Sequence, residues 1–180
     1  MSTDREILQL FREGGREQAF RLLVQTYKER LYWHIRRMVL DHDDTDDCLQ
    51  NTFIKVWQSL DRFRGEAQLY TWLYRIATNE TLTFLSKQQT RGDHTVLAAA
   101  ERLSSDPWFD GDQLQAELHK AIAKLPPKQK AVFNLRYFEE MPYEKISEVL
   151  ETSEGALKAS YHHAYEKVKA SLKEAMDPKY

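Results

Sequence analysis

Apolar side chains recur at intervals of three and four residues through the first half of the chain, from Glu17 to about Lys87. The series begins with Phe20, Leu23 and Tyr27 and continues at the same spacing. Because an α-helix completes one turn every 3.6 residues, this spacing collects the apolar side chains in a stripe along one side of a helix. The pattern therefore predicts amphipathic helices that bury their stripes against one another.

The second predicted helix follows an acidic break in the pattern at residues 41–44. Thr45 is the expected N-cap, and Asp46 and Asp47 then lie in the first turn, where the helix dipole favours negative charge. The apolar stripe of this helix consists of Leu49, Phe53, Val56 and Leu60. Its opposite face, which could dock a partner or could simply be solvated, carries Asp47, Gln50, Asn51, Ile54 and Gln58.

Residues 62–66 are typical of a loop, and a third helix is expected to begin near Leu69. Trp72 shares one helical face with Leu73 and Ile76. We therefore expect Trp72 in the hydrophobic core. The pattern does not predict whether the residues on the other faces of this helix are buried or exposed.

Helical periodicity fails between residues 87 and 112, where Gly, Pro, Ser and Asp are mixed. This composition is typical of a flexible linker, although residues 96–103 could form a turn or two of helix. From residue 113 onward helical spacing returns as four segments, and strand-like alternation is absent throughout the sequence. The predicted fold is all-α, with two small helical domains at residues 1–86 and 113–180 joined by the linker.

The last two segments of the chain have the pattern of a helix-turn-helix. Pro142 suits the first position of a short helix, and Ser153 is the expected N-cap of a longer one. The stripe of the longer helix that should face the core is Leu157, Tyr161, Ala164, Val168 and Leu172. Its other side carries Lys158, Ala159, His162, Lys169 and Lys173, with His163 at the edge. Such a helix can enter a DNA major groove with lysines reaching phosphate, but an ordinary surface helix would show the same polar face.

The charge balance limits what this helix-turn-helix can do alone. The 180 residues hold 26 Lys and Arg against 28 Asp and Glu, a formal net charge of −2. Residues 113–180 contain eleven basic and ten acidic side chains, a net charge of +1. Because counterion release from phosphate drives most nonspecific DNA binding, a nearly neutral domain should bind duplex DNA weakly. Another component must therefore supply the affinity for DNA.

Several other chemistries are excluded by the residue types present. The single cysteine, Cys48, rules out an internal disulfide framework and a Cys-rich zinc module, and it agrees with a reducing, cytoplasmic location. No stretch approaches the roughly 18 apolar residues of a membrane span, and the N-terminus does not have the pattern of a signal peptide.

The acidic segment that begins at Asp41 superficially has the spacing of a calcium-binding loop. Its sixth position is Asp46 where such loops need glycine, and its twelfth is Thr52 where they need a bidentate glutamate. The adjacent His162 and His163 are wrongly spaced for two metal ligands on one helix face. We therefore expect no catalytic residue, no metal and no cofactor, and a metal-dependent enzyme that uses the acidic segment is the remote alternative.

Four stretches read together resemble the extracytoplasmic-function group of bacterial sigma factors. They are, in order, DTDDCLQNTFIKVWQSL, FRGEAQLYTWLYRIATN, a variable linker, and LPPKQKAVFNLRYFEEMPYEKISEVLETSEGALKASYHHAYEKVKASL. The likeness covers about residues 10–86 and 113–175. It implies a dissociable subunit that joins core RNA polymerase at the beta-prime clamp and beta flap, directs the enzyme to promoter DNA and helps melt it. The resemblance also implies an anti-sigma factor as a partner, and the chemistry of transcription belongs to the polymerase.

The resemblance also implies three sets of binding residues. The clamp would be bound by Asp47, Gln50 and Asn51. The start-proximal promoter element would be captured as a single strand by Phe63, Arg64, Gly65, Tyr70 and Asn79, because unstacked bases need planar surfaces and directional amide groups. The upstream element would be read by Arg136, Tyr143, Glu144, Lys158, Ser160, His162 and His163. Tyr70 fits a core role as well as a stacking role.

The sequence departs from the pattern of the family in three places. Asn51 replaces an acidic residue that is frequent there, and the last helix offers Lys158, Ser160, His163 and Tyr165 where several arginines are common. Because arginine makes bidentate contacts to guanine, the upstream element that this chain reads should not be rich in guanine. The turn carries Glu151 where glycine is frequent, at a cost of about 1 kcal/mol if the backbone there is left-handed. The alternative to a sigma factor is a helical adaptor that binds polymerase or another protein without reading promoters.

Overall fold

The computed structural model describes residues 3–92, 95–107 and 109–177, and all regular elements in these ranges are helical. The helices of the first half are α1 (Thr3–Arg12), α2 (Arg16–Val39), α3 (His42–Ser59), the short η1 (Leu60–Arg62) and α4 (Leu69–Thr90). They are followed by α5 (Thr95–Glu101), η2 (Leu103–Ser105), α6 (Gln113–Ala123), α7 (Pro127–Tyr137), α8 (Tyr143–Leu150) and α9 (Glu154–Met176). The all-α prediction is confirmed.

The first half is built around α2, α3 and α4, which pack on one another as the apolar stripes predict. Leu23, Ile35 and Leu73 are fully buried between them. The sequence pattern missed α1, which packs against α2 through the buried Ile7. The hydroxyl of Tyr27 also donates a hydrogen bond to an Asp4 carboxylate oxygen at 2.7 Å, and this bond fixes α1 in place.

The start of α3 corrects one prediction. Thr45 is not the N-cap, because the helix begins a turn earlier and the side chain of Asp41 accepts a hydrogen bond from the Asp44 amide at 2.9 Å. Thr45 is buried and its hydroxyl donates to the Asp41 carbonyl at 2.7 Å. Asp41 is therefore the N-cap, because its carboxylate is the one that accepts a hydrogen bond from a free amide of the first turn.

The segment expected as a linker contains α5 and η2, at the place where a turn or two of helix was expected. Ala99, Ala100 and Leu103 are buried, and both elements contact α6. The next helix, α6, begins with a reciprocal capping box, in which Asp112 accepts from the Gln115 amide and the Gln115 side chain accepts from the Asp112 amide.

The last three helices have the predicted helix-turn-helix arrangement. Ser153 is the N-cap of α9 as expected, with its hydroxyl accepting from the Ala156 amide at 3.3 Å. Pro142 is the N-cap of α8 rather than its first helical residue, a shift of one position. The expected stripe of α9 faces the core, with Leu157, Ala164 and Val168 buried and Tyr161 and Leu172 half-buried.

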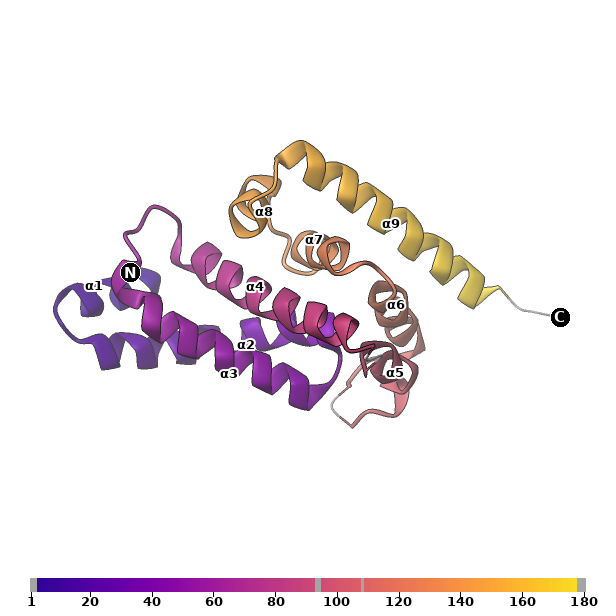
Figure 1. Ribbon diagram of the computed structural model, residues 1–180, viewed down its shortest axis with the longest axis horizontal. Coiled ribbons are helices and arrows are strands. Elements are labelled where there is room, and N and C mark those ends of the chain that lie inside the picture. The colour runs from indigo at the N-terminus through magenta and orange to yellow at the C-terminus, as the bar shows by residue number, and fades with distance from the viewer. Residues whose placement is uncertain (1–2, 93–94, 108, 178–180) are drawn as a thin grey trace.

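The two halves of the chain pack against each other. α8 packs against α4, and α7 lies between α4 and α9 and also contacts α2 (Figure 1). A single cluster of buried side chains runs from Ile7 in α1 through Leu73 in α4 to Ile146 and Leu157 in the helix-turn-helix. A second, smaller cluster joins α6, α7 and α9 around Ile122 and Phe133.

Candidate nucleic-acid interface

The loop before α4 is held by a glycine and a pair of rings. Gly65 has φ +77°, a left-handed conformation that side-chain-bearing residues rarely adopt, and a Cβ there would meet nothing within 4 Å. Backbone conformation rather than space therefore favours glycine. The ring of Phe63 lies 4.9 Å from that of Trp72 between centroids, so the base of the loop is pinned to α4. Arg64 is exposed at the loop.

Two of the predicted DNA-binding residues of α4 differ in exposure. Tyr70 is half-buried with its ring 6.5 Å from that of Tyr74, and Asn79 is exposed. Trp72 is half-buried and packs on the core, which supports the structural role expected for it. The structure also places the exposed guanidinium of Arg75 one turn before Asn79 on the same helix face. Sequence reasoning missed Arg75, although its i, i+4 spacing from Asn79 was a signal that could have revealed it.

The outer face of α3 is exposed as expected. Asp47, Gln50 and Asn51 project from one side of the helix within two turns, away from the buried Cys48 and Leu49. Ile54 continues this face, and the residue is 49% exposed. A polar surface with one large exposed apolar residue at its centre is suited to a protein contact.

The helix-turn-helix brings three of its predicted residues together. The guanidinium carbon of Arg136 lies 4.9 Å from the centroid of the Tyr143 ring, and the ammonium of Lys158 lies 5.8 Å from the same centroid. The aromatic ring thus lies within cation–π distance of two cations, one from α7 and one from α9, and this attraction orients both side chains. Glu144 is exposed in the first turn of α8.

The remaining predicted residues of α9 line its outer side. His162 and His163 are exposed with ring centroids 6.0 Å apart, and Ser160 is half-buried. With Lys158 they form a small, polar and weakly basic surface near the N-terminus of the helix. Such a surface offers hydrogen-bond donors and acceptors to base edges but little phosphate attraction.

The turn before α9 is left-handed at Glu151, with φ 51° and ψ 44°, which is the conformation for which glycine is favoured at this position. Two side-chain bonds hold this turn. The hydroxyl of Ser147 donates to the Thr152 carbonyl at 2.7 Å, and that of Thr152 donates to the Leu150 carbonyl at 3.0 Å. The strained backbone is therefore stabilised locally.

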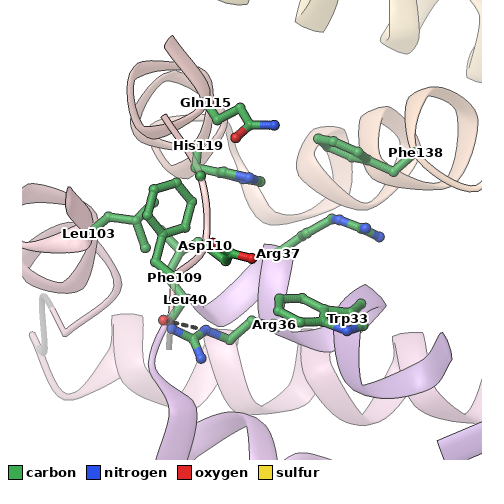
Figure 2. Close-up of a pocket in the computed structure, with 11 residues that line it drawn as sticks. Trp33, Arg36, Arg37, Leu40, Leu103, Phe109, Asp110, Gln115, His119 and Phe138 are labelled. Carbon is green, nitrogen blue, oxygen red and sulfur yellow. Dashed lines mark hydrogen bonds between the residues drawn. The ribbon is translucent and has the colours of Figure 1, made fainter. Parts of the chain in front are cut away.

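A cavity of about 490 Å³ lies where the linker meets both halves of the chain. Figure 2 shows Trp33, Arg36 and Arg37 of α2 on one side and His119 of α6 on another, with Phe109 of the linker between them. Arg36 donates to the Leu40 carbonyl at 2.9 Å and to an Asp106 carboxylate oxygen at 2.8 Å. Burial lowers the pKa of His119 to about 4, so its imidazole is neutral near pH 7.

Within residues 3–92, 95–107 and 109–177, no three His, Cys, Asp or Glu side chains are gathered as ligands for a metal ion. The helices in the same ranges also include none that is long and apolar enough to cross a bilayer.

Comparison with protein families gives two matches in chain order. Residues 23–91 match sigma-70 region 2, and residues 115–168 match sigma-70 region 4. The first match contains α3, the loop and α4, and the second contains α7, α8 and the first half of α9.

Individual relatives agree with the family matches. The chain is 31% identical over 175 residues to the RNA polymerase sigma-H factor of Pseudomonas aeruginosa, with 89% of each chain covered. It is 29% identical over 186 aligned residues to the ECF RNA polymerase sigma-E factor of Haemophilus influenzae, with 97% of each covered.

Two solved structures share the fold. One is CnrH in complex with the cytosolic domain of CnrY, with a TM-score of 0.70 and 23% identity over 98% of this chain and 100% of that one. The other is the sigma factor RpoE of Bartonella quintana in complex with the anti-sigma factor NepR. It has a TM-score of 0.66 and 21% identity, and the match covers 88% of this chain and 98% of that one. The order of the two matched regions, their place in the fold and the full-length relatives all lead to one conclusion: the chain belongs to the extracytoplasmic-function sigma factors of RNA polymerase.

Proposed function

We propose that this chain recruits core RNA polymerase through the outer face of α3 and reads a promoter at two separate elements, one with α4 and its preceding loop and the other with α9. The observation that carries this proposal is the separation of exposed polar surfaces over the two family-matched regions. Asn79 projects from α4, whereas Lys158 and His162 project from α9. An adaptor without DNA contacts would need neither surface.

The start-proximal element is taken up by the loop and α4 in this proposal. Arg64 and Arg75 are exposed cations that precede and follow Tyr70 in the sequence. They are suited to the phosphates of a separated strand, which for Arg75 would replace its ion pair with Glu151. The exposed amide of Asn79 can both donate to and accept from the edge of an unstacked base. Because Gly65 and the Phe63–Trp72 contact fix the loop, the strand meets a preformed surface.

The upstream element is read by the first two turns of α9. Lys158 can reach phosphate, and the imidazoles of His162 and His163 can bond base edges or backbone. Arg136, held by Tyr143 and by a hydrogen bond to the Met141 carbonyl at 3.2 Å, can contact the DNA backbone beside α8. A DNA contact with so few cations is weak by itself. Binding of the upstream element therefore depends on the polymerase, which holds both promoter-binding surfaces on the same DNA.

The chain supplies no catalytic group in this proposal, and nucleotide addition is carried out by the polymerase in the cytoplasm. The partner proteins are core polymerase, through its beta-prime clamp and beta flap, and an anti-sigma factor. The second partner is supported by one of the two solved structures of this fold, in which the sigma factor RpoE is in complex with the anti-sigma factor NepR.

The function is tested by transcription in vitro with bacterial core polymerase on a library of randomised promoters. We expect initiation from templates that share two separated sequence motifs. Asp47→Arg should abolish polymerase binding and transcription together, because it reverses a charge on the α3 face, whereas Glu29→Arg on the exposed side of α2 should leave both intact. Polymerase binding without initiation at any template would support the adaptor instead.

A further inference from the structure

A further cavity, of about 580 Å³, lies where the end of α4 meets α5 and the turn between α6 and α7. Its size falls within the roughly 300–1,000 Å³ that is usual for sites of small organic ligands. Most of its wall is apolar, and the larger apolar side chains are those of Leu85, Val96, Leu97, Leu125, Pro126 and Pro127. We call it the Lys130 cavity, after the one charged residue of the wall that is buried.

Lys130 of α7 carries a positive charge that is almost completely removed from water. The residue is 3% exposed, and its ammonium donates a hydrogen bond to the Met38 carbonyl at 3.3 Å. It forms no ion pair with any carboxylate in the described part of the chain. Burial lowers the pKa of Lys130 to about 8, so the ammonium still predominates at pH 7.

A buried cation without a carboxylate partner is unusual, because a desolvated charge is normally paired with a charge of opposite sign. The ammonium has three donors, and the Met38 carbonyl accepts from one of them. Because the four-carbon stem of lysine is flexible, the other donors can turn to a ligand in the cavity that Lys130 lines. These donors are suited to an anion.

The other polar residues of the wall agree with an anionic ligand. Gln88 of α4 is only 8% exposed, and its side-chain amide makes no hydrogen bond within the ranges that the structure describes. Lys124 adds an exposed cation, and the residues that line the cavity include no Asp or Glu. An amide N–H and an ammonium both donate to a carboxylate, whereas a cationic ligand would meet only positive charges.

We propose that the Lys130 cavity binds a medium-chain aliphatic carboxylate, whose head accepts from Lys130 and Gln88 and whose chain lies against the apolar wall. Inorganic phosphate suits the cavity less, because the apolar wall cannot replace the water that a small, highly charged ion loses. None of the residues assigned to polymerase or promoter lines this cavity, so the inference does not depend on the proposed function.

The ligand class is tested by isothermal titration calorimetry of the full chain with sodium octanoate at pH 7, below its micelle concentration. Octanoate should bind at one site, and hexanoate should bind more weakly by about fourfold for each CH₂ that it lacks. 1-Octanol, which has the same chain without the charge, should bind at least about tenfold more weakly than octanoate, because hydrogen bonds to charged groups are the stronger ones. Phosphate at the same concentration should not displace octanoate.

Lys130→Met tests the role of the buried ammonium. The variant keeps an unbranched side chain and removes a buried charge, and thermal unfolding checks that it is folded. Its affinity for octanoate should fall at least about tenfold, whereas its affinity for 1-octanol should stay the same. Lys128→Met, which changes an exposed lysine of the same helix outside the cavity, is the matched control and should bind octanoate like the unmodified chain.

Gln88→Leu provides a second variant that leaves the buried charge in place. It should weaken octanoate binding by about twofold to tenfold, because one donor to the carboxylate is lost, and it should not weaken 1-octanol. The proposal is overturned if octanoate does not bind, if 1-octanol binds as tightly, or if Lys130→Met and Lys128→Met bind octanoate equally.

Displacement of octanoate by phosphate would assign the cavity to an inorganic anion and would also overturn the proposal. These measurements use neither polymerase nor DNA. A chain that binds octanoate as expected but never initiates transcription would therefore overturn the proposed function alone, and the opposite result would overturn this inference alone.

Discussion

At the scale of single residues, the exposed side-chain amide of Asn79 makes no hydrogen bond within the part of the chain that the structure describes. Its backbone carbonyl accepts from the Thr83 hydroxyl at 2.9 Å, but its side chain projects from the helix. Asparagine in the middle of a helix is slightly unfavourable, so a residue of this type on an exposed face favours a binding role.

Asn79→Ala should therefore reduce open-complex formation while leaving affinity for core polymerase unchanged. Loss of one directional base contact corresponds to about 1–3 kcal/mol, or roughly fivefold to a hundredfold. Permanganate reactivity of the melted strand measures the effect. The control is Gln89→Ala, an exposed amide near the end of the same helix, and equal behaviour of the two variants would remove Asn79 from the site.

The buried His34 makes stability depend on pH. Its side chain is fully buried, its Nε2 lies 2.8 Å from the Thr78 hydroxyl, and burial lowers its pKa to about 3. The unfolded chain takes up a proton near pH 6.5, whereas the folded chain does not until about pH 3, so stability falls as the pH drops below about 6.5.

Between pH 7 and pH 5 the unfolding free energy should fall by about 2 kcal/mol through His34 alone. Urea unfolding at several pH values measures this slope. His34→Gln should reduce the slope without abolishing it, because burial also lowers the pKa of His119 to about 4, whereas His163→Gln, which changes an exposed histidine, should keep the slope of the unmodified chain. An unchanged slope in His34→Gln would show that other groups cause the acid sensitivity.

At the scale of elements, local patterns identified most helices but not all of their ends. The apolar stripes of α2, α3, α4 and α9 follow directly from helical spacing, and Ser153 is a strong cap by residue type. The start of α3 was missed because an acidic break offers several competing caps, and only the fold decides which aspartate reaches a free amide. The helix α1 was missed because one buried residue, Ile7, anchors it.

The corrected cap can be tested on α3 directly. Asp41→Ala should lower the unfolding free energy by about 1 kcal/mol, because the Asp44 amide loses its acceptor. Thermal unfolding followed by circular dichroism measures the loss. Asp43→Ala, which removes a neighbouring exposed carboxylate in the first turn, should cost less; an equal loss would attribute the effect to helix-dipole charge instead of capping.

At the scale of the whole molecule, periodicity predicts which faces are apolar but not which helices bury them together. The two halves are joined by an ion pair of Arg37 in α2 with Glu139 before α8 and by an ion pair of Arg75 in α4 with Glu151 after α8, and these partners are far apart in sequence and belong to no local motif. The proposed binding surfaces were predictable where a single helix face carries them, as on α3 and α9. Arg75 was not assigned, although its spacing from Asn79 was a local signal, whereas its ion pair with Glu151 depends on the fold and could not be predicted from one helix.

The central claim of this account is that a nearly neutral chain gains promoter selectivity on the polymerase. Fluorescence anisotropy of a labelled duplex promoter, taken from the enriched library, should detect little binding by the free chain at physiological salt. The chain together with core polymerase should bind the same duplex tightly and prefer it over a scrambled sequence. Tight, sequence-specific binding by the free chain, or no gain in selectivity with polymerase, would contradict the account.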